Sequence, residues 1–313
     1  MPRHRPWSLA LLLCFALLMS CRQAPKPTKA LNPNAPVDLR ITEEPFEAQA
    51  ALSRRMSILT AYLQRTTGLN VRYVPSINYV HSYALLERGE VDLVFVGIYG
   101  GHRLLDALPN AIPLVVQKPS YRLVMLGRRR WTEELAAGST SSLDLVQGRR
   151  VGFGSRFSGS TFLQPLLAMQ EEGLNPSSIE HCLHEPNQKH LPAHVADGLL
   201  DFVFVPSFNG QDDQFIPESL RDELAVVWVG TPRRNDYLVT TDNPEDPSRQ
   251  DSLRKVQNAF LAMHPSDTQG RQLLESWGYS GWELPTPEFP GAVNQRIDVL
   301  LSRSGQLPSC EAA

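Results

Sequence analysis

Two similar stretches decide the fold: residues 89–97 (GEVDLVFVG) and residues 197–207 (DGLLDFVFVPS). Each has a glycine at the end of a helical pattern, then an aspartate, then an unbroken apolar run. Such a run is typical of a strand that is buried on both faces of a sheet. The repetition indicates two similar α/β lobes, although a Gly-x-x-Asp turn before a strand is also common in αβ units in general.

The chain around these stretches alternates short apolar strands with amphipathic helices. A helix is predicted over residues 47–68, where Met56, Leu59 and Leu63 share one face and Gly68 ends the pattern. Further strands are predicted at 37–44, 70–76, 110–117, 121–127, 149–154, 179–185 and 224–230, and further helices at 78–90, 98–108, 161–173, 191–200, 217–224, 253–263, 271–278 and 294–305. This repeated alternation predicts an α/β fold with mostly parallel sheets.

The N-terminus has the pattern of an export signal. Arg3 and Arg5 precede an uncharged apolar run at residues 9–18, which is too short to span a bilayer comfortably but suits a signal-peptide core. Cys21 follows in a stretch that resembles the bacterial lipoprotein box. We therefore expect a signal peptide at residues 1–20 and lipidation of Cys21; the alternative is ordinary secretory cleavage near position 20.

The next residues, 21–36, are rich in Pro, Ala, Asn and Lys and have no hydrophobic period. This composition predicts a flexible tether between a membrane and the folded body. The expected location is the periplasmic face of the cell envelope, with the protein held at a membrane by its lipid.

Charge and cysteine content exclude several classes of protein. The chain has 30 Lys+Arg against 33 Asp+Glu, a net charge of -3, whereas a nucleic-acid-binding protein is normally basic. No Cys/His spacing resembles a zinc site, so no metal and no cofactor is expected. Cys182 and Cys310 remain in the folded body; a periplasm permits a disulfide between them, but two free thiols are predicted.

The junction FGSRFSGSTF, residues 153–162, is the strongest candidate site. The first N–H groups of a helix lack intrahelical acceptors and, with the helix dipole, favour an anion. Ser158, Ser160 and Thr161 add hydroxyl groups, and Gly159 lets an anion approach the backbone closely. Plain helix capping is the alternative, but three hydroxyls and a glycine exceed what a cap needs. The junction therefore predicts an oxyanion site at a helix start.

The sequence resembles the periplasmic solute-binding proteins of the phosphate/phosphite/phosphonate class, which deliver substrates to ABC importers. Three segments carry the resemblance: residues 77–97 (INYVHSYALLERGEVDLVFVG), 151–165 (VGFGSRFSGSTFLQP) and 194–207 (HVADGLLDFVFVPS). In the second segment Ser158 and Ser160 match the two serines of the family and Pro165 matches its proline, whereas Thr161 stands where the family usually has glycine. The resemblance covers roughly residues 37–300.

The resemblance implies a two-lobed fold of the type 2 periplasmic-binding-protein class, in which each lobe is a mostly parallel sheet flanked by helices. The implied lobes are residues 37–120 with 236–303 and residues 121–235, followed by a tail at 304–313. Two hinge strands, 121–127 (YRLVMLG) and 235–241 (NDYLVTT), are expected to join the lobes.

The family also implies ligand contacts outside the junction. Tyr79, at the start of a helix, is expected to face the ligand, and Tyr99 lies in the region of a cleft wall. The family often has an aromatic residue where this chain has Val96, a departure that points to a different ligand.

Further contacts are implied in the second lobe. The family often places a histidine in the loop that holds His184 and His190, and its polar ligand contacts follow the strand that precedes Ser207 and Asn209. The spacing of His184 from the next Gly-x-x-Asp is longer than in the family and that of His190 is shorter, so either histidine or neither is the contact.

Charged residues near the expected cleft have two interpretations each. Glu43 and Glu44 end the first strand, where they repel a dianion unless they accept a hydrogen bond from a protonated or aminated ligand, or else they cap the next helix. Arg233 and Arg234 either supply positive charge at the cleft or face water.

These features predict the substrate-binding lipoprotein of an ABC importer, which takes a small oxyanion and works with a permease and an ATPase. A ligand-sensing or adaptor lipoprotein that signals to a receptor or kinase is one alternative, and an enzyme of the thiamine-pyrimidine type is another. No nucleophile motif, P-loop or dinucleotide motif is present, so catalysis is not expected.

Overall fold

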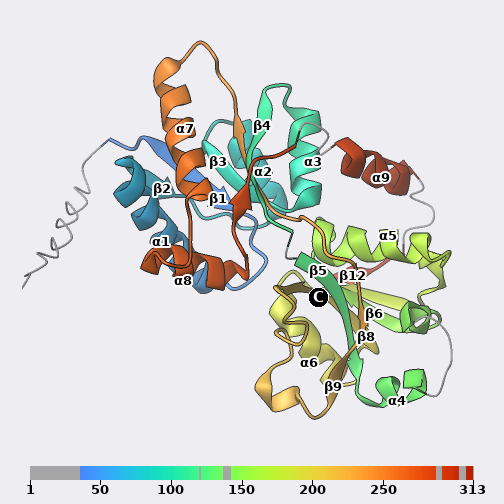
Figure 1. Ribbon diagram of the computed structural model, residues 1–313. Coiled ribbons are helices and arrows are strands. Elements are labelled where there is room, and N and C mark those ends of the chain that lie inside the picture. The colour runs from blue at the N-terminus through green and yellow to red at the C-terminus, as the bar shows by residue number, and fades with distance from the viewer. Residues whose placement is uncertain (1–35, 120, 137–141, 287–290, 303–307, 313) are drawn as a thin grey trace, which may run out of the picture. The chain divides into compact units, whose positions relative to one another are not determined.

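The computed structural model describes residues 36–119, 121–136, 142–286, 291–302 and 308–312. The expected signal peptide, Cys21 and nearly all of the expected tether lie outside these residues. The described elements form two six-stranded sheets, each flanked by helices (Figure 1). We call the part built on each sheet the first lobe and the second lobe, in chain order. The predicted two-lobed α/β fold is confirmed.

The first sheet has the strand order β11-β4-β10-β3-β1-β2. Its strands are β1 (Leu39–Glu43), β2 (Val71–Tyr73), β3 (Leu93–Val96), β4 (Ala111–Gln117), β10 (Tyr237–Thr241) and β11 (Trp282–Glu283). The helices of this lobe are α1 (Gln49–Thr67), α2 (Tyr79–Glu87), α3 (Ile98–Ala107), α7 (Pro247–Leu261) and α8 (Thr268–Trp277).

The second sheet has the strand order β12-β7-β6-β8-β5-β9. Its strands are β5 (Tyr121–Arg128), β6 (Arg150–Phe153), β7 (His181–His184), β8 (Phe202–Phe208), β9 (Leu224–Val229) and β12 (Glu311–Ala312). Its helices are α4 (Arg130–Ala136), α5 (Gln164–Glu171) and α6 (Leu191–Ala196), and α9 (Gly291–Ser302) precedes the last strand.

Alternation along the strands divides the core of each lobe between two faces. In β3, Leu93 and Phe95 pack with α1, α7 and α8, whereas Val94 and Val96 pack with α2 and α3. In β8, Val203 packs with α6, while the residues on either side of it face α5. Because both faces are covered, these strands are apolar throughout, as the sequence predicts.

The repeated Gly-x-x-Asp turn does the same structural work in both lobes. Gly89 and Gly198 have φ angles of 67° and 75°, which other residues rarely adopt. Asp92 accepts from the backbone N–H of Arg40 at 2.7 Å, and Asp201 accepts from that of Arg150 at 3.0 Å. Each aspartate therefore fixes the entry of its strand to the neighbouring parallel strand, β1 in the first sheet and β6 in the second.

Both sheets are mixed: parallel pairings predominate in the second sheet, as predicted, whereas antiparallel pairings predominate in the first. In the first sheet β1 pairs in parallel with β2 and β3, but β10 pairs antiparallel with β3 and β4, and β11 is antiparallel to β4. In the second sheet β6, β7, β8 and β12 pair in parallel, while β5 is antiparallel to β8 and β9. In each sheet the strand that follows a crossing, β5 or β10, is antiparallel to both of its neighbours.

The hinge differs in position from the prediction. Residues 121–127 lie wholly in the second sheet, and β10 lies wholly in the first. The chain crosses between the lobes just before each strand, and the two crossings are joined to each other. Arg233 N–H donates to the carbonyl of Tyr121 at 2.7 Å, and Gln117 N–H donates to the carbonyl of Asp236 at 2.9 Å. The two crossings therefore act as one paired hinge.

Three further predictions need correction. Cys182 and Cys310 form a disulfide, with Cα atoms 4.5 Å apart, instead of two free thiols. The pairing of β12 with β7 brings the two cysteines together, a contact between residues 128 positions apart that no local pattern encodes. The expected tail thus contains a strand. The helix expected at residues 217–224 is only a 3₁₀ turn, Glu218–Leu220.

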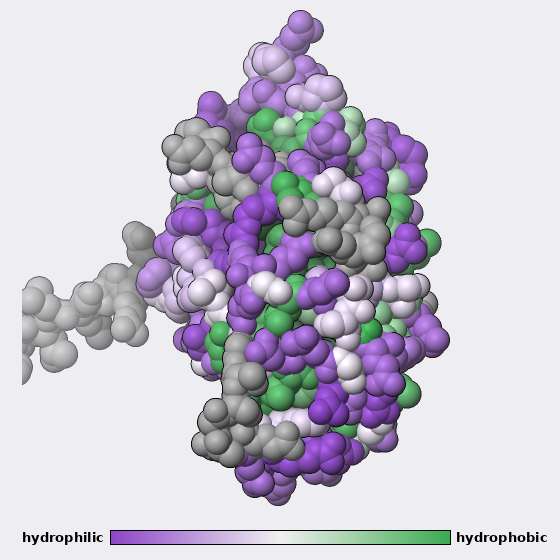
Figure 2. Space-filling view, turned by 90° about the vertical axis from the view of Figure 1, so that its right-hand side faces the viewer, coloured by the Kyte–Doolittle hydropathy of each residue, from purple (hydrophilic) through white to green (hydrophobic). Residues whose placement is uncertain are grey.

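On the face shown in Figure 2, apolar residues form separate patches among hydrophilic ones. Exposed apolar side chains in the described residues include Ile112, Leu284 and Val299. Scattered exposure of this kind is normal for a folded protein. No described helix is long and apolar enough to cross a membrane.

Candidate functional site: a cavity between the two sheets

A cavity of about 360 Å³ lies where the two lobes meet. The first lobe contributes Glu44, Phe46, Tyr79, Gly97, Trp277 and Tyr279, among others. The second lobe contributes Ser158, Gly159, Ser160, Gln188, Lys189, Phe208 and Phe215. Asn235 and Asp236, in the second crossing, complete one wall. The volume is in the range of small-molecule sites.

Ser158 caps the helix that faces the cavity. This helix starts with a π-helical turn, Gly159–Leu163, and continues as α5. The Ser158 hydroxyl accepts from the N–H of Thr161 at 3.1 Å. Within the described part of the chain, no hydrogen bond takes up the N–H of Gly159 or Ser160. Ser158 therefore caps this helix while two backbone N–H groups beside it remain available to a ligand.

Pro165 explains the π-helical turn. A proline has no N–H, so the carbonyl of Thr161 loses its α-helical donor. This carbonyl accepts instead from the N–H of Gly154 at 3.3 Å, and the carbonyl of Ser160 accepts from the Tyr121 hydroxyl at 3.0 Å. These two hydrogen bonds hold the start of the helix against the second sheet. The N–H groups at the helix start therefore keep a fixed direction.

Thr161 lies behind the site rather than in it. Its side chain is fully buried, and its hydroxyl donates to the Ser158 hydroxyl at 2.9 Å. Gly154 makes room for it, since a Cβ there would stand 2.0 Å from the Thr161 hydroxyl. Thr161 therefore orients Ser158, while Ser158 and Ser160, whose hydroxyls are 3.2 Å apart, reach the cavity wall.

Tyr79 approaches the same hydroxyls from the first lobe. Asn78 caps α2 by accepting from the N–H of His81 at 2.8 Å, which fixes the first residue of the helix, Tyr79. The phenol hydrogen-bonds with Ser158 and Gln188. Burial raises the pKa of Tyr79 well above its usual value, so it remains a neutral donor at physiological pH.

Gly159 allows the second lobe to contact the N-terminus of α3. A Cβ at Gly159 would stand 2.3 Å from the Ile98 side chain and 2.8 Å from the Tyr99 backbone nitrogen. The sequence predicts close approach of a ligand at this glycine; the structure shows close approach of the other lobe as well.

Carboxyl groups line the first-lobe wall. Glu44 accepts from the N–H of Gly97 at 2.9 Å and from the Tyr83 hydroxyl at 2.5 Å, and Asp236 accepts from the side chains of Asn235 and Tyr279. Burial raises the pKa of Glu44 to about 8 and that of Asp236 to about 6. Neither forms an ion pair within the described residues; near pH 7 Glu44 mostly keeps its proton, whereas Asp236 has mostly lost its own.

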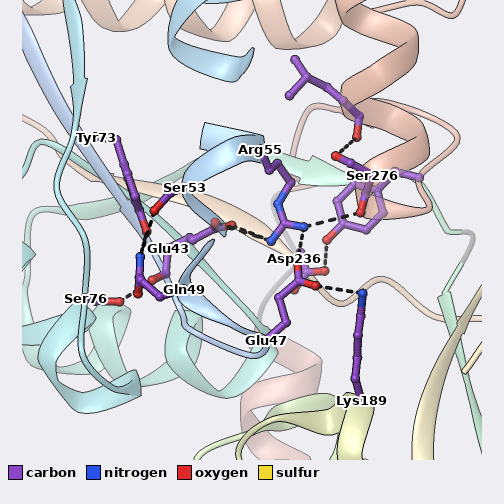
Figure 3. A network of polar contacts seen from close by, with 12 residues as sticks. Glu43, Glu47, Gln49, Ser53, Arg55, Tyr73, Ser76, Lys189, Asp236 and Ser276 are labelled. Carbon is purple, nitrogen blue, oxygen red and sulfur yellow. Dashed lines mark hydrogen bonds and ion pairs between the residues drawn. The ribbon is translucent and has the colours of Figure 1, made fainter. Parts of the chain in front are cut away.

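A charged network joins the lobes at the cavity rim (Figure 3). Arg55 of α1 binds Glu47 at 2.6 Å and Glu43 at 3.4 Å, and Lys189 of the second lobe binds Glu47 at 3.0 Å. Burial raises the pKa of Glu47, but Arg55 and Lys189 outweigh that effect and lower it overall. Burial raises the pKa of Glu43 to about 7, although Arg55 opposes this. Glu47 is thus the ionised carboxylate of the network, and it forms ion pairs with both Arg55 and Lys189.

Two uncharged contacts also connect the lobes. Gln188 N–H donates to the carbonyl of Phe46 at 3.3 Å, and the Asn209 side chain donates to the carbonyl of Gly278 at 2.8 Å. The rings of Phe208 and Tyr279 lie 5.6 Å apart beside the second contact. The cavity is therefore enclosed by contacts on more than one side.

The structure brings some of the predicted site residues together and leaves others away from the cavity wall. Tyr79, Ser158, Gly159 and Ser160 line it, as does Glu44. In the described structure, Thr161, Tyr99, His184, Ser207 and Asn209 are absent from the lining.

The residues away from the wall have structural contacts instead. Tyr99 stacks on Phe157, Asn209 bridges the lobes as described above, and the Ser207 hydroxyl donates to Asp212 at 2.5 Å. His184 hydrogen-bonds with the carbonyl of Gly154 at 2.8 Å, and burial lowers its pKa.

The remaining candidates pair with carboxylates or the local backbone. Arg233 binds Glu171 at 3.3 Å, and Arg234 binds Glu283 at 2.5 Å. His190 lies on the exposed side of its loop, where its ring contacts Asn187 at 3.0 Å. Neither arginine is among the lining residues of the described cavity. No group of His, Cys, Asp and Glu in the described residues has an arrangement that would hold a metal ion.

Sequence reasoning missed the aromatic wall and Asp236. Phe46 and Tyr279 lie outside helices and strands, Phe208 is the last residue of β8, and none of the three belongs to a motif. Asn235 and Asp236 were assigned to a hinge strand, with no chemical role. The one available signal was their position, since polar residues at a crossing between two lobes necessarily lie next to the space between them.

The fold and the cavity define a two-lobed solute-binding protein. The chain belongs to the family of periplasmic substrate-binding proteins of ABC phosphonate transporters, whose family model matches residues 41–288. Members of this family are transport-associated binding proteins of the periplasm, and the function of this chain is substrate binding for such a transporter.

A curated relative is a probable ABC transporter phosphite binding protein, PhnD1, from Prochlorococcus marinus (strain MIT 9301). It is 22% identical over 252 residues, 77% of this chain and 82% of the relative. The structure of PhnD1 with methylphosphonate matches with a TM-score of 0.72 and 17% identity, over 84% of this chain and 98% of PhnD1.

Two further structures have the same fold. A binding protein component of an ABC phosphonate transporter from Pseudomonas aeruginosa matches with a TM-score of 0.66 and 14% identity, over 85% of this chain and 87% of its own. The aliphatic sulphonate binding protein SsuA from Escherichia coli matches with a TM-score of 0.58 and 14% identity, over 88% and 95%.

Proposed function

We propose that this protein captures a phosphonate or a similar small oxyanion in the cavity and holds it at the helix start formed by Ser158, Gly159 and Ser160. The observation that carries the proposal is the set of donors there: two hydroxyls and two unused backbone N–H groups at the positive end of a helix. Tyr79 adds a donor from the other lobe. An anion that binds donors from both lobes favours the closed state.

Neutral donors suit a protein that must release its cargo. Hydrogen bonds to a charged group contribute about 1.5–3 kcal/mol each, so a few of them give useful affinity without a buried cation. Lys189 is the lysine on the cavity wall, and Glu47 already neutralises it. The match with PhnD1, which was solved with methylphosphonate, supports the choice of this anion as a first probe.

The test is calorimetry with methylphosphonate, phosphate and sulfate. Ser160→Ala is expected to weaken methylphosphonate binding by roughly tenfold or more, the loss of one hydrogen bond to a charged group. Ser158→Ala is expected to do the same and also to cost about 1 kcal/mol of stability, because Ser158 caps the helix. We expect the protein to release methylphosphonate unchanged, as ³¹P NMR would show, since we propose no catalytic role.

A matched control separates binding from capping. Asp246 caps α7, accepting from the N–H of Arg249 at 3.0 Å, away from the cavity. Asp246→Ala should lower stability by about 1 kcal/mol and leave binding unchanged. Full binding by the Ser158→Ala, Ser160→Ala double variant would place the ligand elsewhere, and a wild-type protein that binds none of the three anions would contradict the proposed ligand class.

We further propose that Cys21 is lipidated and that residues 21–36 tether the protein to the membrane beside its permease and ATPase. The lipoprotein-like sequence supports the anchor, and the transporter family supports the partners. Mass spectrometry of the mature protein should show a diacylglyceryl group on Cys21, and Cys21→Ser should release the protein from membranes. A mature N-terminus without lipid, at or beyond Cys21, would refute the anchor.

A further inference from the structure

The chain passes between the lobes a third time, and this passage ends in a covalent bond. After β11 in the first sheet, the chain continues through α9 and joins the second sheet as β12. Glu311 pairs with Leu183 of β7, and the disulfide between Cys310 and Cys182 lies directly beside this pairing. The C-terminal segment that starts in the first lobe is therefore bonded to the second.

Helix α9 contacts both lobes between these two attachments. Asp298 binds His102 of α3 in the first lobe at 3.0 Å. Arg296 forms an ion pair with Glu171 of α5 in the second lobe. Leu300 is fully buried in the core cluster that includes residues of α2, α3 and α5. Figure 1 shows α9 beside α3 and near α5.

The covalent bond matters because the ion pairs described for α9 are weak ones. Its ion pairs involve partly exposed side chains, since Asp298 is 62% exposed and Arg296 is 41% exposed. Exposed pairs of this kind contribute little. Ion pairs of this kind add little to the docking that the buried Leu300 provides, and the disulfide holds the segment that follows α9 at the second lobe.

We infer that α9 is a clamp between the lobes and that the Cys182–Cys310 disulfide keeps it docked. The paired crossings beside Tyr121 and Gln117 form a single hinge, about which two lobes rotate. A helix that contacts α3 on one side and α5 on the other opposes this rotation. The disulfide persists in an oxidising compartment, so the clamp is complete only after export.

The test compares three proteins without any ligand, so its outcome does not depend on the proposed anion. The first is Cys182→Ser with Cys310→Ser, which removes the bond and leaves no unpaired partner. The second is Arg296→Ala with Asp298→Ala, which keeps the bond but removes the polar contacts of α9 with both lobes. The control is Val205→Ala, which weakens the core of the second sheet in a different cluster from the one that holds Cys182 and Leu300.

Hydrogen exchange and small-angle X-ray scattering give the two readouts. In the double serine variant the amides of residues 291–302 should exchange about tenfold faster or more, as expected when a helix undocks. The radius of gyration should rise by about 1 Å above the roughly 19 Å of a compact chain of this size. The Arg296→Ala, Asp298→Ala variant should shift both readouts in the same direction by less, and Val205→Ala should change neither.

Two outcomes would overturn the inference. If residues 291–302 keep their protection in the double serine variant, the disulfide does not hold α9. If they lose protection but the radius of gyration stays at the wild-type value, α9 does not oppose the motion of the lobes. A double serine variant too unstable to study leaves the second variant as the test, with an unchanged exchange rate and radius counting against the clamp.

Discussion

Replacing Gly159 with alanine is expected to lower the affinity for methylphosphonate roughly tenfold to a hundredfold, the equivalent of 1–3 kcal/mol of overpacking. The new Cβ would stand 2.3 Å from the Ile98 side chain and 2.8 Å from the Tyr99 nitrogen. Ile98 is 5% exposed and the second atom is backbone, so neither moves easily. The lobes must then stay farther apart, and a ligand loses contact with one of them.

The same substitution should cost the unliganded protein less free energy than it costs ligand binding, because unliganded lobes can move apart to relieve the clash. Calorimetric titration gives the affinity and thermal unfolding without ligand gives the stability. Gly101→Ala is the matched control: it lies in α3, the helix that Gly159 approaches, and its nearest neighbour atom is 3.4 Å away on Tyr237. Gly101→Ala should bind normally. Normal binding by Gly159→Ala would show that the close approach is not needed.

The fold was predictable because its determinants are local. Two residues define each turn, Gly89 with Asp92 and Gly198 with Asp201. The glycine adopts the positive φ angle, and the aspartate side chain accepts a hydrogen bond from the backbone of the neighbouring strand. The disulfide had no such local signal. Whether Cys182 and Cys310 meet depends on a two-residue strand at the end of the chain, which is too short to produce a pattern.

The hydrogen-bond donors of the site were also predictable because their determinants are local in the sequence. Ser158 and Ser160 stand at a strand–helix junction, and such junctions have a known chemistry. The prediction missed that Thr161 faces inward, which depends on the space beside Gly154. It also left the role of Glu44 open. That role depends on burial, since the same carboxyl group is an ordinary anion in water and a largely neutral acceptor beside Tyr83 and Gly97.

Anion binding is expected to weaken as the pH rises, because the cavity wall becomes negative. Asp236 loses its proton near pH 6 and Glu44 near pH 8, since burial raises both pKa values. A carboxylate about 5 Å from a bound anion costs roughly 3 kcal/mol at an effective dielectric constant of about 20. The affinity for methylphosphonate should therefore fall by roughly tenfold or more between pH 6 and pH 9.

The unliganded protein should show the matching trend in stability. The pKa of Glu44 is 4.5 in the reference state and about 8 in the folded protein. Between these values the folded state keeps a proton that the unfolded state has released, so stability falls as the pH rises from about 4.5 to about 8 and then levels off. Asp236 adds a smaller loss between its reference value of 3.8 and about 6.

Comparison of Glu44→Gln with the wild type isolates the contribution of Glu44 to the pH dependence of binding, because the ligand itself titrates in the same way in both experiments. Glutamine keeps an oxygen for the N–H of Gly97 and cannot ionise. The variant should bind methylphosphonate at pH 9 at least tenfold more tightly than the wild type and should differ little from it at pH 6. Glu90→Gln, on an exposed turn and not among the residues that line the cavity, serves as the control for loss of one negative charge. If Glu44→Gln and the wild type keep a constant affinity ratio from pH 6 to pH 9, Glu44 does not control the charge of the site.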